Sequence, residues 1–121
     1  SAITALTLDM SEAGAATFNS SVKGDVFIDS VEIITNDGVT VSKGFTGVTT
    51  GGSNRVATLP AAAAGNVGAM YTIKKLDSGS GSVQVTRAGD DTIDGGTSVV
   101  LYHQHESVTV IVGAADTWYV I

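Results

Sequence analysis

The sequence contains no cysteine, a single proline and few aromatic residues. Without cysteine, the chain forms no disulfide and offers no thiolate ligand to a metal. Basic residues are also scarce, since six lysines and arginines stand against twelve acidic residues and the net charge is −6. A protein that binds duplex nucleic acid usually needs a basic surface to neutralise the phosphates. We therefore expect no nucleic-acid partner.

Long apolar runs are missing as well. No run approaches the roughly 18 apolar residues that span a bilayer. No basic stretch followed by an apolar stretch marks a signal peptide. We therefore expect no membrane partner. With 121 residues, the chain is long enough for one domain, or for a small domain that carries an arm.

The sequence is rich in glycine, serine, threonine and small aliphatic residues. Fifteen glycines and an apolar alternation with period two predict short strands joined by tight turns, with almost no helix. The fold class is predicted to be all-β, an antiparallel β-sandwich or small barrel. Residues 1–30 are interpreted as an extended N-terminal arm or linker and residues 31–121 as the β domain. The predicted strands are residues 3–8, 26–28, 31–34, 39–41, 55–59, 69–76, 82–87, 97–102, 107–112 and 117–121.

Turn residues predict how these strands are paired. Asn36-Asp37-Gly38 supplies the residues of a tight hairpin turn between residues 31–34 and 39–41. A Ser/Gly turn at residues 77–81 predicts a second hairpin, and residues 113–116 predict the last turn. Residues 46–53 are interpreted as a connector. Residues 60–65 begin with proline and end with glycine, as one helical turn would.

Two histidines are the first candidates for chemistry. His103 and His105 are two positions apart, so in a strand both imidazoles would face the same side, as two metal ligands do. The alternative is an exposed polar turn between strands, and we favour it. The prediction is therefore no metal site and no cofactor, with His103 and His105 as weak metal candidates.

The remaining candidates also have structural explanations. Asp90, Asp91 and Asp94 could bind a hard cation, but they lack the spacing of a calcium loop, and Asp side chains commonly stabilise turns. Trp118, Tyr119 and Tyr102 could stack on sugars, although a lone Trp in a terminal apolar strand is more often core or interface. Lys74, Lys75 and Arg87 could pair across a hairpin with acids on a neighbouring subunit or shell, and as solvated residues of an edge strand they need no partner. Nothing in the sequence selects a catalytic pair, so we predict no enzymatic activity.

Four segments in the order found here resemble a C-terminal module of bacteriophage virion proteins, notably tail fibres. They are a Leu-Pro-Ala-rich turn (residues 59–65), a Tyr-Thr-Ile-Lys strand (residues 71–75), a Thr-Ile-Asp-Gly turn (residues 92–95) and a terminal Trp-Tyr strand (residues 118–121). Residues 2–18 are similar to linking segments of phage fibres. The resemblance implies a structural part at the virion surface.

Two placements in a virion are considered. A capsid decoration protein, which binds the major capsid protein, needs only a compact domain and an arm, and it is favoured if the chain is a whole gene product. The alternative is the receptor-binding tip of a trimeric tail fibre, which contacts tail components and a host surface receptor. A thin core without disulfides favours oligomers, and the phage modules resembled here are commonly threefold. We expect a homotrimer in which Val110, Val112 and Trp118 contribute to the core or the subunit interface.

Overall fold

The computed structural model describes residues 31–121. The interpretation of residues 1–30 as an arm, and the strands predicted at residues 3–8 and 26–28, lie outside the described residues. The domain is all-β, as predicted, and the one helical element within residues 31–121 is the short 3-10 helix η1 (Ala64–Asn66). The strands are β1 (Val31–Ile34), β2 (Val39–Thr40), β3 (Phe45–Val48), β4 (Arg55–Thr58), β5 (Met70–Lys75), β6 (Val83–Thr86), β7 (Thr92–Ile93), β8 (Ser98–Leu101), β9 (Ser107–Ala114) and β10 (Thr117–Val120).

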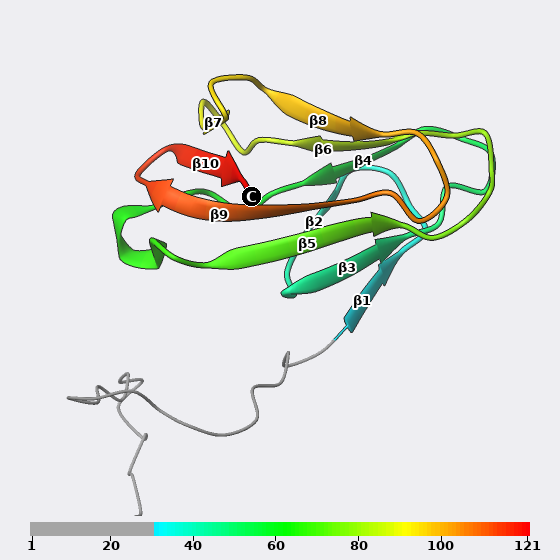
Figure 1. The fold of residues 1–121 in the computed structure, drawn as a ribbon, viewed down its shortest axis with the longest axis horizontal. Coiled ribbons are helices and arrows are strands. Elements are labelled where there is room, and N and C mark those ends of the chain that lie inside the picture. Colours follow the sequence, from blue (N-terminus) through cyan, green and yellow to red (C-terminus); the bar gives the residue numbers. More distant parts are fainter. Residues whose placement is uncertain (1–30) are drawn as a thin grey trace, which may run out of the picture.

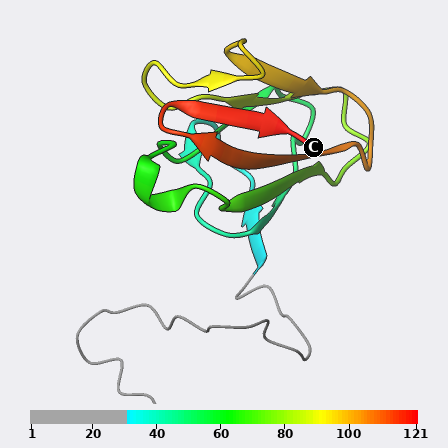
Figure 2. The ribbon, with the colours of Figure 1, turned by 60° about the vertical axis from the view of Figure 1, so that its left-hand side comes forward.

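The strands form two facing sheets (Figure 1). The six-stranded sheet has the order β1-β3-β5-β9-β10-β7, and the four-stranded sheet has the order β2-β4-β6-β8. Turned by 60°, the domain shows the C-terminal strands β9 and β10 lying across one side of it (Figure 2). The two sheets enclose a single core.

The first six strands form a coil. The chain crosses to the other sheet after each of them, so that β1, β3 and β5 are parallel neighbours in one sheet and β2, β4 and β6 are parallel neighbours in the other. We call each odd-numbered strand of this group, with the strand that follows it, a rung. Five of the eight strand pairings in the described residues are parallel. The prediction of antiparallel sheets was therefore wrong, because the sheets are mixed.

The turn at Asn36-Asp37-Gly38 joins two sheets instead of two paired strands. Gly38 has the positive φ of 71° that its position in the motif predicts. Its N–H donates to the carbonyl oxygen of Val56 (2.9 Å), and the Asp37 carboxylate accepts from the Val56 N–H (2.6 Å). The turn is thus bonded to β4, the neighbour of β2. Both predicted hairpins, at this turn and at residues 77–81, were wrong, because the strands on either side lie in different sheets.

After the third rung the chain reverses direction. β8 pairs antiparallel with β6, and β9 pairs antiparallel with β5. β9 and β10 form a hairpin through the turn predicted at residues 113–116, where Asp116 has a φ of 57°. β7 then pairs with β10 in parallel. The returning strands β9 and β8 thus cover the free edges of β5 and β6.

The core follows the alternation of the strands. Inward positions of both sheets are almost completely buried, as in a sandwich. Trp118 is the largest of these side chains, and its ring meets Tyr71 edge-on, with the centroids 5.7 Å apart and the planes at 71°. The buried apolar residues are Ile34, Val41, Val48, Ala57, Leu59, Ala62, Ile73, Val83, Val85, Ile93, Leu101, Val108, Val110, Val112 and Trp118.

Candidate functional site

A buried lysine lies where the third rung turns from one sheet to the other. The side chain of Lys75 is inaccessible to solvent, although it ends in a charge. Its Nζ donates to the backbone carbonyl oxygens of Asp77 (2.6 Å) and Gly79 (2.8 Å), and it lies 3.3 Å from the Asp77 carboxylate. β5 is central in its sheet, so the prediction that Lys75 is a solvated edge residue was wrong.

The carboxylate of Asp77 joins this turn to the turn of the preceding rung. It accepts from the backbone N–H groups of Thr50 and Gly51 (both 3.0 Å) and from the Thr50 hydroxyl (3.0 Å). The Thr50 N–H is the main cause that holds the pKa of Asp77 well below its usual range, and Gly51 and Lys75 add to it. A carboxylate this acidic is a poor general base at neutral pH. The cluster is therefore a structural connection between rungs.

The two histidines lie in the connection between β8 and β9. His103 and His105 are both exposed, and they are in a turn, so the same-face geometry of a strand does not apply. Glu106 closes this turn by accepting from the backbone N–H groups of His103 and Tyr102, which lower the pKa of its carboxyl. Residues 31–121 contain no group of three or more His, Cys, Asp or Glu side chains that could hold a metal ion.

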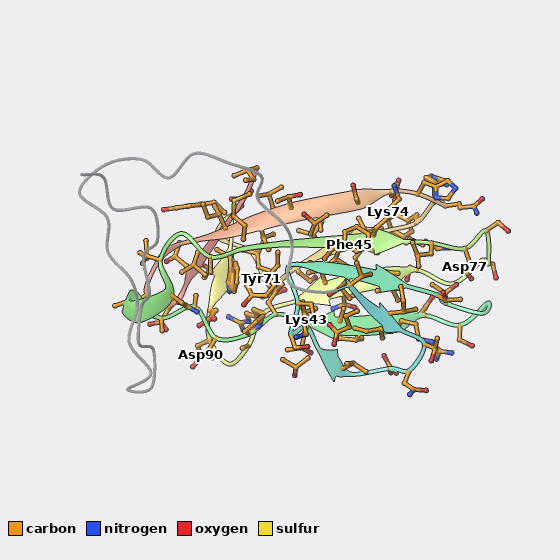
Figure 3. All side chains as sticks on the ribbon, turned by 90° about the horizontal axis from the view of Figure 1, so that it is seen from below. Lys43, Phe45, Tyr71, Lys74, Asp77 and Asp90 are labelled. Atoms are coloured by element: carbon orange, nitrogen blue, oxygen red, sulfur yellow. The ribbon has the colours of Figure 1, made fainter. Side chains whose placement is uncertain are left out.

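The acidic residues at 90–94 stabilise the structure at the other end of the domain. Asp91 is buried, and its carboxylate accepts from the N–H of Ala62 (2.8 Å). Asp94 accepts from the N–H of Val120 (3.2 Å) in the last strand. Asp90 is exposed and lies at the opposite end of the domain from Asp77 (Figure 3). The carboxylates of Asp91 and Asp94 thus bind backbone groups of segments distant in sequence, and not the nearby backbone N–H groups that the turn explanation expected.

Val110, Val112 and Trp118 are all buried in the core of the chain itself. Trp118 cannot stack on a sugar, because no part of its ring is accessible. Tyr102 and Tyr119 are exposed, but Tyr102 follows β8 and Tyr119 lies in β10, in different sheets. The structure does not bring the three aromatic side chains together as one binding surface.

The outer faces of the two sheets differ in chemistry. On the four-stranded sheet the outward residues are mainly polar, and Thr40, Thr58, Thr86 and Ser98 form one row across its strands. On the six-stranded sheet the outward residues are divided between apolar ones and polar ones such as Thr72, Lys74, Ser107 and Thr109. The most exposed of the apolar side chains are Val31 (61%), Ile33 (56%), Met70 (50%) and Tyr119 (49%).

The register places these apolar side chains on one side of the sheet, which we call the apolar face, in two clusters with Thr72 and Thr109 between them. Met70 pairs with Ile111, and Ile111 pairs with Tyr119, so the three side chains lie in a row across β5, β9 and β10. Val31 pairs with Phe45 in the neighbouring strands β1 and β3. Among the outward positions of β1, β3, β5 and β9, Lys74 is the one charged residue.

Sequence reasoning missed this face as a candidate site. Its signal was present, because β9 has Ile111 between the inward residues Val110 and Val112. A strand that is apolar on both sides is covered on both sides or exposes an apolar surface. In the described residues the apolar surface is exposed.

The part of the chain that the structure describes contains no pocket. Nor does it contain a helix long and apolar enough to cross a membrane. Comparison of the chain with protein-family models, with curated proteins and with solved structures finds no significant match.

Proposed function

We propose that this protein is a non-enzymatic structural component of a bacteriophage virion surface. The sequence resemblance to phage virion modules is the support for the virion. The apolar face is the observation that supports a structural role, because an exposed apolar surface of several neighbouring strands is typical of a protein–protein interface. The acidic side chains with perturbed pKa values bind backbone groups in turns, which is a further argument against catalysis.

The apolar face is proposed as the surface at which copies of the chain meet in a homotrimer. Val110, Val112 and Trp118 already fill the core of one chain, so a subunit interface needs other residues. Ile33, Met70 and Tyr119 are apolar, exposed and on one side of the domain. A face with almost no charge is also compatible with itself, since contact between copies buries few ionised groups.

Capsid decoration is the first candidate for the placement in the virion, with the major capsid protein as partner. The tip of a trimeric tail fibre is the second candidate, and one observation favours it. The parallel rungs are stacked in one direction, and the first rung consists of the edge strands β1 and β2. A coil of this kind suits an elongated assembly, in which each added rung extends the molecule along one axis.

Separation of virions into heads and tails tests these placements. Decoration predicts that the protein is recovered with heads at a copy number that matches the capsomer sites, and the fibre predicts recovery with tails at a few copies. A protein found with neither part would contradict the virion proposal. Light scattering of the purified protein at high micromolar concentration adds a second criterion. A stable trimer in solution fits both candidates, and a monomer that trimerises only on capsids fits decoration alone.

A further inference from the structure

A tyrosine ring rests on a glycine in the hairpin of β9 and β10. A Cβ atom at Gly113 would collide with the ring of Tyr119, so the ring occupies the space that a side chain of residue 113 would need. The φ of Gly113 is not in the left-handed region that favours glycine. The backbone therefore does not require a glycine there, and the missing side chain is what makes room for the ring.

This contact fixes a side chain that is half exposed. The exposed fraction of Tyr119 is 49%, and β10 lies between β9 and β7, so the ring is on the outer face of the sheet and not at its edge. A side chain that is already held in one position loses little conformational entropy when an interface buries it. Tyrosine is also one of the residues that most often dominate the binding energy of protein interfaces.

The ring has apolar neighbours on the same face. Ile111 pairs with Tyr119 across the hairpin, and Met70 pairs with Ile111 in the next strand. Ile121 is two positions after Tyr119 and is 65% exposed, and its N–H donates to the carbonyl oxygen of Thr109 (2.9 Å). We call Met70, Ile111, Tyr119 and Ile121 the Tyr119 cluster, which is one of the two clusters of the apolar face.

The polar residues beside the Tyr119 cluster are compatible with burial in a contact. The hydroxyl groups of Thr72 and Thr109 are hydrogen-bonded to each other (2.9 Å). A partner that covers them therefore leaves neither hydroxyl without a hydrogen bond.

Charge favours a second copy of the chain as the occupant. The net charge is −6, so copies repel each other unless the contact keeps their acidic residues apart. In the described strands β1, β3, β5, β9 and β10, no outward position has an acidic residue. A second copy supplies the same apolar surface, and contact between two such surfaces buries few ionised groups.

We propose that Tyr119 is the anchor of the contact between copies of the chain, and that Gly113 is the seat that fixes its ring. The inference rests on the proposed homotrimer and adds the residue that dominates its interface. In the trimer each Tyr119 ring is buried against the apolar face of a neighbouring copy. Because the seat belongs to β9 of the same chain, the ring is in position before the copies meet.

Removal of the ring tests the anchor. Tyr119→Ala should raise the concentration at which half of the trimer dissociates by about 30-fold or more. Tyr119→Phe keeps the ring and should dissociate as the parent does. Tyr102→Ala is the matched control, since Tyr102 is 64% exposed and lies outside the Tyr119 cluster. Sedimentation equilibrium over a range of concentrations measures each value, and circular dichroism checks that each variant is folded.

Gly113→Ala tests the seat, because it keeps the tyrosine and displaces its ring. It should weaken the trimer by about tenfold or more. Gly65→Ala, where an added Cβ atom meets open space, should leave the trimer unchanged.

The outcomes separate this inference from the homotrimer itself. A parent protein that stays monomeric at high micromolar concentration would overturn the trimer in solution and the inference with it. A trimeric parent whose Tyr119→Ala variant is equally trimeric would overturn the inference alone, and so would equal weakening by Tyr102→Ala. A Gly113→Ala trimer as stable as that of the parent would contradict the role of Gly113 as the seat.

Discussion

Lys75 and Asp77 stabilise the turn of the third rung through two sets of hydrogen bonds. The Lys75 Nζ donates to the carbonyl oxygen of Asp77, while the carboxylate of the same Asp77 accepts from Thr50 and Gly51 in the turn of the second rung. A buried ammonium group without such partners would be strongly destabilising. These two side chains therefore connect neighbouring rungs where the backbone leaves the sheets.

The first prediction concerns the pH dependence of stability. The pKa of Asp77 is lower in the folded chain than its ordinary value of about 4, so the unfolded chain binds the proton first as the pH falls. The contribution of Asp77 is complete above about pH 4 and is lost as the pH falls below it. Asp77→Asn should therefore flatten the decline of the melting temperature between about pH 4 and pH 2, measured by thermal unfolding followed by circular dichroism.

Asp90→Asn is the matched control for this prediction, since Asp90 is exposed and lies at the other end of the domain. Its pH profile should follow that of the parent protein. An Asp77→Asn variant whose stability declines with acid as steeply as the parent would show that the connection between the rungs does not depend on the ionised carboxylate.

The second prediction concerns Trp118. The ring is completely buried against Tyr71, so Trp118→Ala should lower the free energy of unfolding by about 3 to 5 kcal/mol. Trp118→Phe should cost clearly less, because it keeps an aromatic ring and removes the indole Nε1, which is buried and lacks an acceptor in the described part of the chain. Chemical denaturation measures both values. Tyr102→Ala, at an exposed aromatic residue, should change stability by less than about 0.5 kcal/mol.

The third prediction concerns the apolar face. If copies of the chain meet there, Met70→Lys introduces a charge into the interface and should convert trimers to monomers at micromolar concentration, while the fold is retained. Gln84→Lys places the same charge on the polar outer face of the other sheet and should leave the trimer intact. Light scattering after size-exclusion chromatography measures the mass. Dissociation of both variants, or of neither, would place the subunit contact elsewhere.

The fourth prediction concerns Gly81, which lies where two successive turns pack closely. A Cβ atom at Gly81 would collide with the backbone carbonyl group of Ser53. Gly81→Ala should therefore destabilise the fold by about 1 to 3 kcal/mol. Gly65→Ala is the control, because Gly65 is exposed and an added Cβ atom there would meet open space. Similar unfolding midpoints for the two variants would contradict the close packing of the turns.

Most strands could be predicted from the sequence, but β3 could not. β3 contains Thr46 and Gly47, and residues 46–53 were interpreted as a connector. The Thr46 hydroxyl donates to Glu32 in β1, and Gly47 is covered by the side chain of Leu76. Both residues are buried in the sheet by partners distant in sequence. The composition of a short segment does not indicate which distant residues will pack against it.

Strand pairing was the least predictable part of the fold. Asn-Asp-Gly is the usual signal of a hairpin, and Gly38 does adopt the conformation that the motif favours. The motif specifies a reversal of the chain and not the partner of the following strand. The spacing between neighbouring rungs also varies, from fourteen residues between Val31 and Phe45 to twenty-seven between Phe45 and Thr72. A search for a repeat of fixed length therefore finds none, although the coil is regular in space.

The acidic residues at 91 and 94 could be predicted to bind backbone groups, but the expected partners were the nearby N–H groups of the turn, and the observed partners, Ala62 and Val120, are distant in sequence. The apolar face could not, since a strand with apolar residues on both sides does not say which side a neighbour covers. Only the registry of Met70, Ile111 and Tyr119 across three strands shows that they form one surface.

The returning strands β8 and β9 give the coil a defined terminus. They run against β6 and β5, so no further parallel strand can be added beyond the third rung. The parallel coil thus ends at the third rung, because antiparallel strands occupy the edges at which a fourth rung would pair. A fourth parallel rung inserted after β6 would therefore have to displace β8 and β9 from these edges.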